Sequence, residues 1–267
     1  MIEAAKGGAP AASDQYVQSL ARGLAVIRAF DTDHPQMTLT EVADRTGLTR
    51  ATARRFLHTL VELGYVRTDG KVFALTAKVL QLGYAYLSGL SLPQLAQPYL
   101  EELALRLGES TSAAVLDGTD IAYIARVSTK RIMTVGITVG TRFPAYATSM
   151  GRVLLAALPP AQLQEYLSTA DIRPLTPQAL GTPKALLAEL DTVRTQGWCL
   201  LDQELELGLM SIAAPVHDGP KVVAAINVSL QAQAVTAQPD PESYLASVRA
   251  ATVETAELIS ADLSSGR

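Results

Sequence analysis

The clearest structural pattern in this sequence lies at residues 39–66, LTEVADRTGLTRATARRFLHTLVELGYV. Two segments with helical periodicity are separated by Gly47, which can adopt the left-handed backbone conformation that a sharp helix exit requires. Thr40 is expected to cap the first helix, and Thr49 is expected to cap the second, which runs over residues 50–63. The spacing predicts a helix-turn-helix, with the second helix presenting its first turn and its outer face.

The flanking residues extend this pattern on both sides. Upstream, a helix is predicted from Ser19 to the residues before Pro35, and one of its faces is apolar: Leu20, Leu24, Ile27 and Phe30. Downstream, two short apolar segments within residues 65–75 flank Asp69 and Gly70, a strong signal for a β-hairpin. The ordered set predicts a winged helix-turn-helix domain over residues 16–75, after a disordered arm at residues 1–15.

The net charge of −4 hides a local basic region. Residues 45–71 hold two acidic side chains, Glu62 and Asp69, against six basic ones: Arg45, Arg50, Arg54, Arg55, Arg67 and Lys71. Neutralisation of phosphates by such side chains supplies much of the affinity for DNA. Charge alone favours a solvated surface, whereas charge together with the order of the elements favours a DNA-binding domain.

A helix candidate over residues 76–90 follows the hairpin, and its broad apolar side carries one charged residue, Lys78. We interpret residues 76–92 as a linker that dimerises, which would set the spacing of two DNA half-sites. Packing within its own subunit is the alternative. Dimerisation is favoured, so the protein is expected to be a homo-oligomer, a dimer or a tetramer.

Residues 93–267 are predicted to form one α+β domain around an antiparallel sheet. Helices are expected at residues 93–107, 150–157, 160–167, 184–196 and 242–262. Strands are expected at residues 111–116, 121–127, 132–137, 199–204, 210–217 and 221–230. Strands and helices do not alternate regularly and there is no dinucleotide-binding fingerprint, which argues against a nucleotide-binding fold.

Two of these strands have one bulky apolar face and one face of smaller, partly polar residues. The bulky set in the last strand includes Val222, Ala224 and Ile226, whereas Asn227 and Ser229 share the other face. A small polar face leaves room for a ligand and supplies groups that orient it. A solvent-facing side of the sheet explains the pattern equally well.

Three arginines near these elements could bind a carboxylate in a bidentate manner: Arg126, Arg142 and Arg152. Thr148 or Ser149 is expected to cap a helix whose free amides would also suit an anion. For each arginine taken singly, a structural salt bridge is the favoured interpretation. Glu204 and Glu206 are expected to be solvated turn residues rather than paired catalytic carboxylates.

The sequence shows no catalytic constellation. Its one cysteine, Cys199, excludes an intramolecular disulfide and is expected to be a buried inert thiol. The histidines His34, His58 and His217 have no metal-ligand spacing, so we expect no metal and no cofactor. No apolar run is long enough to span a membrane, and residues 1–15 lack the apolar region of a secretory signal, so a cytoplasmic protein is expected.

The segment 39–66 resembles the DNA-binding domain of the IclR family of bacterial transcription regulators. The resemblance implies that the recognition helix is the segment 49–63. It implies DNA contacts from Arg50, Thr52, Arg54, Arg55 and Thr59, with Arg67 and Lys71 on the wing.

The resemblance extends to RFPAYATSMGRVLLAA at 142–157, GWCLLDQELELGLMSIAAPVH at 197–217 and VVAAINVS at 222–229. These segments are similar to the family's effector domain, a GAF-like sheet that binds small organic acids. The implied pocket residues are Tyr146, Ser149, Met150, Asp202, Ser211, Asn227 and Ser229. The motifs are most similar to those of regulators of protocatechuate and 4-hydroxybenzoate breakdown, which implies an aromatic acid as effector.

We therefore expect a transcription regulator that binds double-stranded operator DNA, responds to a small aromatic acid and controls an aromatic-compound catabolic operon. A regulator of the same family that responds to a non-aromatic small acid is the main alternative. An enzyme that processes a small acid and a protein-binding module are the other readings of the same sequence. Replacement of Arg54 and Arg55 distinguishes a DNA-binding regulator, which should lose operator binding, from a protein-binding module.

Overall fold

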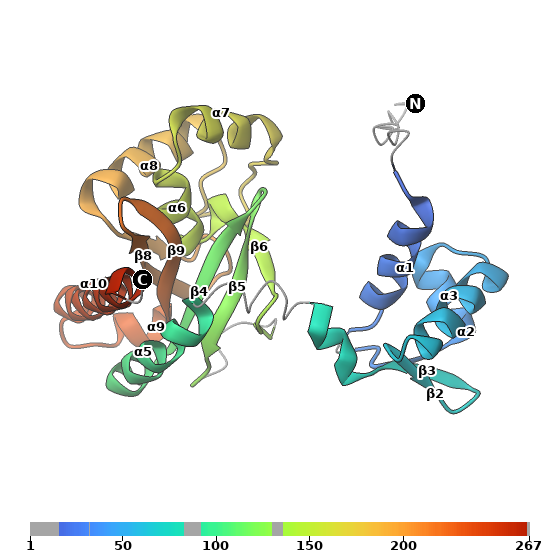
Figure 1. Ribbon diagram of the computed structural model, residues 1–267. Helices are drawn as coiled ribbons and strands as arrows, with labels where there is room; N and C mark the ends of the chain where they lie inside the picture. The colour runs from blue at the N-terminus through green and yellow to red at the C-terminus, as the bar shows by residue number, and fades with distance from the viewer. Residues whose placement is uncertain (1–15, 32, 83–91, 130–135, 266–267) are drawn as a thin grey trace. The chain divides into compact units, whose positions relative to one another are not determined.

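The computed structural model describes residues 16–31, 33–82, 92–129 and 136–265. The chain forms two compact units, Met1–Gly89 and Leu90–Arg267, and each is described by itself (Figure 1). The arm predicted at residues 1–15 lies outside the described residues, and the boundaries predicted for the linker remain predictions.

Three helices and a small sheet form the first unit. The helices are α1 (Gln18–Arg28), α2 (Leu39–Thr46) and α3 (Arg50–Glu62). The sheet has three antiparallel strands in the order β1-β3-β2, with bounds β1 (Gln36–Thr38), β2 (Val66–Thr68) and β3 (Val72–Leu75). The predicted hairpin is thus present as β2 and β3. The strand β1 was not predicted, because three residues before a helix carry too little periodicity to be recognised.

The caps of α2 and α3 differ in how well they could be predicted. The expectation that Thr40 caps α2 is wrong, because Thr38 forms the cap in a reciprocal box with Glu41. Thr38 N donates to the Glu41 carboxylate at 2.7 Å, and Glu41 N donates back to Thr38 Oγ1 at 3.4 Å. Gly47 ends α2 at φ 65°, and Thr49 caps α3 by accepting from Thr52 N, both as predicted.

The core of this unit leaves part of α1 uncovered. Val26 and Phe30 are buried with the apolar sides of α2 and α3. Leu20 and Leu24, which belong to the predicted apolar face, are 63% and 47% exposed. The apolar face of α1 is therefore covered near Phe30 and left open near Leu20 within the described residues of this unit.

The start of the predicted linker helix is visible. Thr76 caps a short 3₁₀ helix, η1 (Ala77–Val79), and residues 80–82 continue as helix. The remainder of the predicted linker at residues 83–91 lies outside the described residues.

The second unit is built on a six-stranded antiparallel sheet in the order β6-β5-β4-β9-β8-β7. Its strands are β4 (Ser110–Asp117), β5 (Asp120–Val127), β6 (Arg142–Pro144), β7 (Cys199–Asp202), β8 (Leu209–Asp218) and β9 (Lys221–Gln231). Five of them match predicted strands, whereas β6 was not predicted. The strand predicted at 132–137 falls largely on residues that are not described, and residues 136 and 137 are not in a strand.

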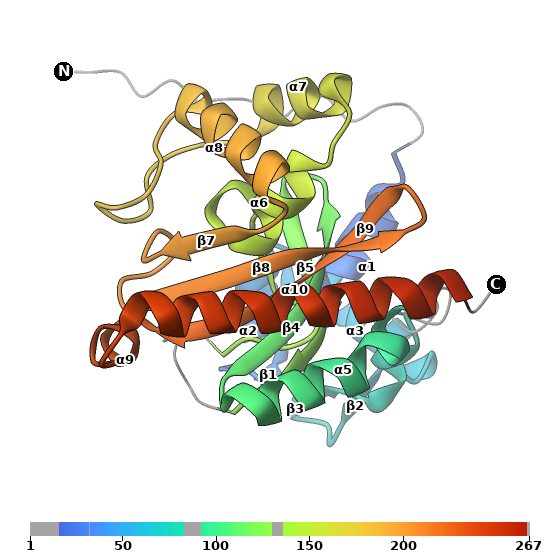
Figure 2. The ribbon, with the colours of Figure 1, turned by 90° about the vertical axis from the view of Figure 1, so that its left-hand side faces the viewer.

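Helices cover both faces of this sheet (Figure 2). One face packs against α5 (Leu92–Leu107) and the long helix α10 (Pro241–Ser265). The other packs against α6 (Ser149–Ala156), with α7 (Pro160–Thr169) and α8 (Pro183–Gln196) beyond it. These helices were predicted, whereas the short helix α9 (Ala232–Thr236) was not.

The two faces of the sheet bury different chemistry. The face beneath α5 and α10 carries large apolar side chains such as Ile212 and Ile226. The face beneath α6 carries Ser211, Asn227 and Ser229, all of them buried. The solvent-facing interpretation of the polar side is therefore wrong, since α6 covers it.

An irregularity in the pairing of β8 and β9 corrects one further detail. The register shifts between Val216 and His217, so Val222 packs with the α6 side and Val223 with the α5 side. The strict alternation that placed Val222 with Ala224 is broken by this bulge, which inserts one extra residue into the pairing.

Candidate functional site

The outer face of α3 presents basic side chains to solvent. Arg50, Arg54, Arg55 and Thr59 are exposed, and Thr52 is half-buried near the cap. The three arginines form no ion pair and no side-chain hydrogen bond with the other described residues. Unpaired arginines at the start and along one face of a helix are available to phosphates and base edges.

The wing adds two more exposed cations, Arg67 on β2 and Lys71 in the turn. Asp69 orders this turn, because its Oδ1 accepts from the backbone N–H groups of Lys71 and Val72, each at 2.9 Å. These two hydrogen bonds hold the pKa of Asp69 below its ordinary value. Gly70 supplies the positive φ of 94° that the turn requires.

The C-terminal end of α3 is anchored by a residue that the sequence reasoning missed as a functional element. Lys78 Nζ donates to Leu63 O at 2.8 Å and lies 5.3 Å from the centre of the Tyr65 ring. Thr76 Oγ1 donates to Gly64 O at 2.6 Å beside it. A cation at a helix C-terminus is stabilised by the helix dipole, so Lys78 helps to hold α3 in place.

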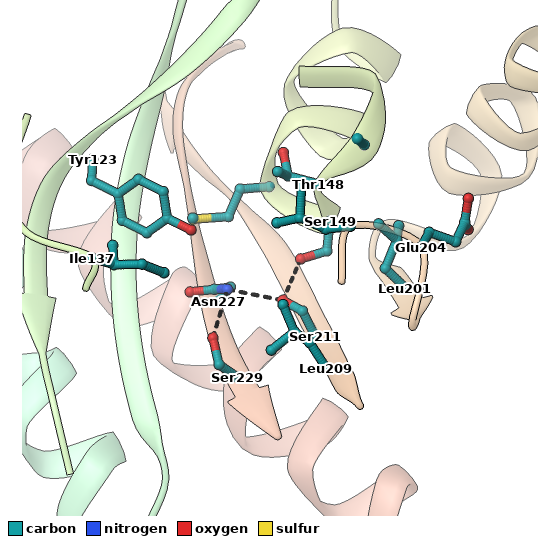
Figure 3. A pocket seen from close by; sticks show the side chains of 13 residues that line it. Tyr123, Ile137, Thr148, Ser149, Leu201, Glu204, Leu209, Ser211, Asn227 and Ser229 are labelled. Carbon is teal, nitrogen blue, oxygen red and sulfur yellow. Dashed lines mark hydrogen bonds between the residues drawn. The ribbon is translucent and has the colours of Figure 1, made fainter. Parts of the chain in front are cut away.

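The second candidate site is a cavity between the N-terminus of α6 and the polar face of the sheet (Figure 3). The space open to the centre of a water molecule is about 20 Å³, and a single buried water needs roughly 10–15 Å³. The described residues around it come from five parts of the unit: Tyr123, Ile137, Ala147, Thr148, Ser149, Met150, Leu201, Glu204, Leu205, Leu209, Ser211, Asn227 and Ser229.

Four of the predicted pocket residues form one hydrogen-bond network on this wall. Ser149 Oγ and Ser211 Oγ lie 2.6 Å apart. Asn227 Nδ2 donates to Ser211 Oγ at 2.8 Å and to Ser229 Oγ at 3.3 Å. The carboxamide oxygen of Asn227 is buried, and no described residue donates a hydrogen bond to it. The network therefore keeps one acceptor turned into the cavity without a donor.

Close packing fixes α6 over this wall. Thr148 caps the helix by accepting from Gly151 N at 3.0 Å, which selects Thr148 over Ser149 as the cap. A Cβ added to Gly151 would lie 2.0 Å from Ala145 O, so only glycine permits this approach. Ser149 is thereby free to face the sheet.

A buried ion pair holds the turn that contributes Glu204 and Leu205 to the wall. Arg152 is 2% exposed and donates to both oxygens of Glu204, at 2.9 and 2.6 Å. Its Nε also donates to Tyr146 O at 2.9 Å. The salt-bridge interpretation of Arg152 is thus supported. The expectation that Glu204 is a solvated turn residue is wrong, because α6 extends its arginine to that carboxylate.

Four of the other predicted effector residues, Arg126 among them, lie outside the described lining of this cavity. Arg142 is exposed and pairs with Asp117 and Asp120 at the edge of the sheet. Tyr146 is buried, but its hydroxyl donates to Arg173 O at 3.0 Å. Asp202 is exposed at the end of β7. Met150, by contrast, does line the cavity.

Arg126 is half-buried on β5 and donates from Nη1 to Ser112 Oγ at 2.9 Å, while its buried Nε has no hydrogen-bond partner in the described parts of the chain. Tyr123 precedes Arg126 by three residues on the same strand. It lines the cavity and was not predicted as a site residue. Burial raises the pKa of Tyr123 to about 12, so its hydroxyl stays protonated and can donate. An aromatic residue in a predicted strand gave no signal that separated it from the core.

Three further properties of the chain concern its cysteine, its possible metal ligands, and the length and polarity of its helices. Cys199 is fully buried as predicted, and burial raises the pKa of its thiol to about 12, which disfavours the reactive thiolate. Among the described residues, no group of three or more His, Cys, Asp or Glu side chains could hold a metal ion. In the same parts of the chain, no helix has both the length and the apolar character to cross a membrane.

A winged helix-turn-helix unit followed by a sheet unit with a buried polar cavity is the organisation of a ligand-responsive transcription regulator. Comparison with known families supports this class. Residues 19–70 match the IclR helix-turn-helix domain, and residues 84–260 match the IclR C-terminal domain of bacterial transcriptional regulators. The chain belongs to the IclR family, and its relatives are transcription regulators rather than enzymes.

Curated relatives include regulators of aromatic metabolism. The Pca regulon regulatory protein of Pseudomonas putida is 47% identical over 239 residues, which cover 89% of this chain and 82% of the relative. The p-hydroxybenzoate hydroxylase transcriptional activator of Acinetobacter baylyi is 37% identical over 232 residues, which cover 85% of this chain and 86% of the relative.

Solved structures agree with the fold. A Rhodococcus sp. RHA1 protein described as a transcriptional regulator has a TM-score of 0.83 and 53% identity, and the match covers 94% of this chain and all of that one. An IclR homolog from Microbacterium hydrocarbonoxydans, solved in complex with 4-hydroxybenzoate, has a TM-score of 0.79 and 26% identity. The match covers 92% of this chain and 98% of that one.

Proposed function

We propose that this protein regulates an aromatic-compound catabolic operon by binding operator DNA through α3 and the wing, under the control of a small aromatic acid such as protocatechuate or 4-hydroxybenzoate. The observation that carries the DNA-binding half is the exposed arginine face of α3, which forms no ion pair with any described residue. The effector half rests on the buried polar network beneath α6 and on what the relatives regulate.

DNA contact follows from the way α3 is held. Arg50 and Thr52 stand in its first turn, where a recognition helix meets base edges in the major groove. Arg54, Arg55 and Thr59 extend along the outer face, and Arg67 and Lys71 reach the flanking phosphates from the wing. The opposite side of α3 is buried in the core of the unit through Ala53, Leu57 and Leu60, so its basic face is presented without refolding.

Effector binding requires the cavity to widen. Its space suits about one water, whereas an aromatic ring is several times larger. The wall must therefore move when the ligand enters, and the bound and empty arrangements of the unit differ. A ligand that binds one arrangement better than another shifts the populations between them, which is the thermodynamic requirement for control.

Oligomerisation is proposed on the exposed apolar side of the first unit. Tyr16, Val17, Leu20 and Leu24 are 47–63% exposed along one end of α1. Pairing with a second copy would cover them and would present two α3 helices to a palindromic operator. Replacing Leu20 and Leu24 by serine is expected to shift the protein to a smaller species in light scattering.

A thermal-shift panel followed by operator titration tests the proposal. The panel contains protocatechuate, 4-hydroxybenzoate, benzoate, pyruvate and glyoxylate. A ligand at about 100 times its Kd stabilises by about 2.7 kcal/mol, which is several degrees for a domain of this size. An aromatic acid should raise Tm and change the affinity for DNA upstream of the protein's own gene. A shift with pyruvate or glyoxylate alone would replace the aromatic effector with an aliphatic one, and absence of specific protection of that DNA would contradict the operator assignment.

A further inference from the structure

Two buried polar atoms on the same face of the large sheet have no hydrogen-bond partner among the described residues. They are Asn227 Oδ1, on a side chain that is 4% exposed, and Arg126 Nε. Buried polar groups in folded proteins are almost always paired, so an exception beside a cavity calls for an explanation. One atom is a neutral acceptor and the other is a charged donor.

The pairing of the strands shows that these residues share a face. Ser112 on β4 is the cross-strand partner of Asn227 on β9 and of Arg126 on β5. Side chains directly opposite one another in antiparallel strands point to the same side. Asn227 and Arg126 therefore both project toward the α6 side, two strand spacings or roughly 10 Å apart.

The internal bonds of Asn227 decide what it can accept from a ligand. Both of its printed contacts use Nδ2, which donates to Ser211 and to Ser229. Figure 3 shows the carboxamide oxygen turned toward the side of the cavity where Tyr123 and Ile137 lie. A hydroxyl group satisfies this oxygen, whereas a carboxylate placed there would repel it.

Glu204 does not compete for that role. Its oxygens accept from both Nη atoms of Arg152, and one of them also accepts from Leu180 N at 2.9 Å. Among the described side chains that line the cavity, Asn227 therefore offers the carbonyl-type acceptor that is left open.

The other end of the face carries positive charge. Arg126 forms no ion pair with the described residues, and its Nη1 is held by Ser112. Arg126 is not among the described residues that line the cavity, but it lies on β5 with Tyr123, which does line it, and its charge acts on the Tyr123 hydroxyl. A carboxylate is the natural partner of an unpaired, partly buried guanidinium.

We propose that the effector is a hydroxylated acid read at both ends: its hydroxyl donates to Asn227 Oδ1, and its carboxylate faces Arg126 beside the Tyr123 hydroxyl. This inference rests on the proposed function and sharpens it. An acid of the same size that lacks the hydroxyl would leave Asn227 Oδ1 buried and unpaired, so the site discriminates by hydroxylation and not only by shape and charge.

Calorimetric titration of the full-length protein with matched ligands tests the hydroxyl end. Wild-type protein should bind 4-hydroxybenzoate about 10- to 100-fold more tightly than benzoate, as expected when one ligand leaves a buried acceptor unpaired. Asn227→Leu, which has nearly the same shape, should reduce that ratio to within about threefold. Asn227→Ser provides the same comparison in a variant that keeps a small polar side chain, in case the leucine variant does not fold.

Ser229→Ala is the matched control for the hydroxyl end. It removes another polar group from the same wall and should weaken both acids while leaving their ratio unchanged. A ratio that survives in both Asn227 variants, or that collapses equally in Ser229→Ala, would overturn the assignment of Asn227.

A neutral ligand tests the acid end. Arg126→Gln should weaken both acids by about tenfold or more, since it removes a charge-assisted bond, while 4-hydroxybenzyl alcohol should bind the variant and the wild type alike. Equal weakening of the alcohol would overturn the role of Arg126. If no aromatic acid binds wild-type protein at all, the proposed effector class fails as well, which is distinct from binding with an unaltered ratio.

Discussion

The arginines of the two units contrast sharply. On α3, Arg54 and Arg55 are exposed and make no ion pair with the described residues. In the second unit, Arg142 is committed to two aspartates, and Arg152 is almost fully buried against Glu204. The same residue type is thus solvated and available on α3, whereas in the second unit it holds the fold together. Burial and partner decide the role, because a desolvated charge must be paired whereas a solvated one is free to bind.

Acid–base behaviour follows the same division. In the first unit, local hydrogen bonds hold the pKa values of the carboxyls Asp31, Glu41 and Asp69 below their ordinary range. In the second unit, burial raises the pKa values of Tyr123 and Cys199 to about 12. Solvated loops tune their groups through neighbours in sequence, and a covered sheet tunes them through desolvation.

The largest effect is expected from breaking the buried pair. Glu204→Ala leaves Arg152 buried without its carboxylate and should reduce the free energy of unfolding by about 3–5 kcal/mol. The measurement is urea denaturation followed by the fluorescence of Trp198, which lies in the same unit. Asp191→Ala, which breaks the exposed Arg194–Asp191 pair at 2.6 Å, should cost less than about 1 kcal/mol. Similar losses in both variants would remove the distinction between buried and exposed arginines.

The next effect is on DNA rather than on stability. The double variant Arg54→Ala, Arg55→Ala should weaken operator binding by about 10- to 100-fold, and the slope of log affinity against log salt should become shallower by about 1.8 if each arginine neutralises one phosphate. Its free energy of unfolding should change by less than about 1 kcal/mol, because both side chains are exposed. Fluorescence anisotropy over a salt series measures the slope.

The double variant Arg106→Ala, Arg173→Ala is the matched control for that experiment. Both side chains are exposed in the second unit, at 57% and 71%, so their loss removes the same two charges from a different surface. Equal weakening of operator binding by this variant would mean that net charge, and not the face of α3, governs affinity.

A smaller effect distinguishes the two threonine caps. Thr148→Ala should cost about 1–2 kcal/mol, because the cap is 5% exposed and Gly151 N would be left without a partner. Thr49→Ala should cost about 0.5–1 kcal/mol, since water can replace the exposed cap. Thermal denaturation of both variants gives the comparison, and a larger loss at Thr49 would contradict it.

The smallest effect concerns pH. The folded-state pKa of Asp69 lies below its unfolded value of about 3.9, so its carboxylate contributes stability that is complete above that pH and is lost as the pH falls through the folded pKa. Asp69→Asn should therefore be less stable than wild type near about pH 7, and the gap should narrow as the pH falls below about 3.9 and through the folded pKa. Circular dichroism during denaturation at both ends of this pH range measures the difference, and a gap that does not change with pH would show that titration of Asp69 plays no part.

Prediction from the sequence succeeded where the physics is local. Gly47, Thr49 and the Asp69–Gly70 turn act through neighbours two to four residues away, and their roles were predicted correctly. The basic face of α3 was also predictable, because exposure follows from helical periodicity once the apolar side is identified. Even here, the choice of Thr38 over Thr40 as a cap depended on a backbone conformation that composition does not reveal.

The buried site behaved differently. Ser149, Ser211, Asn227 and Ser229 were named as pocket residues through resemblance, yet their alternation in the strands was equally consistent with a solvent-facing sheet. Only the position of α6, set by the contact between Gly151 and Ala145, shows that this face is covered.

The remaining assignments belong to tertiary structure alone. The roles of Glu204, Tyr123 and Val222 could not be read locally, because an ion pair across 52 residues, a shared cavity and a shifted register arise between distant segments. Sequence specifies which side chains a helix or strand presents on each side. Packing between elements decides which of those sides loses its water, and that loss of water turns a polar side chain into a binding group or an arginine into a structural one.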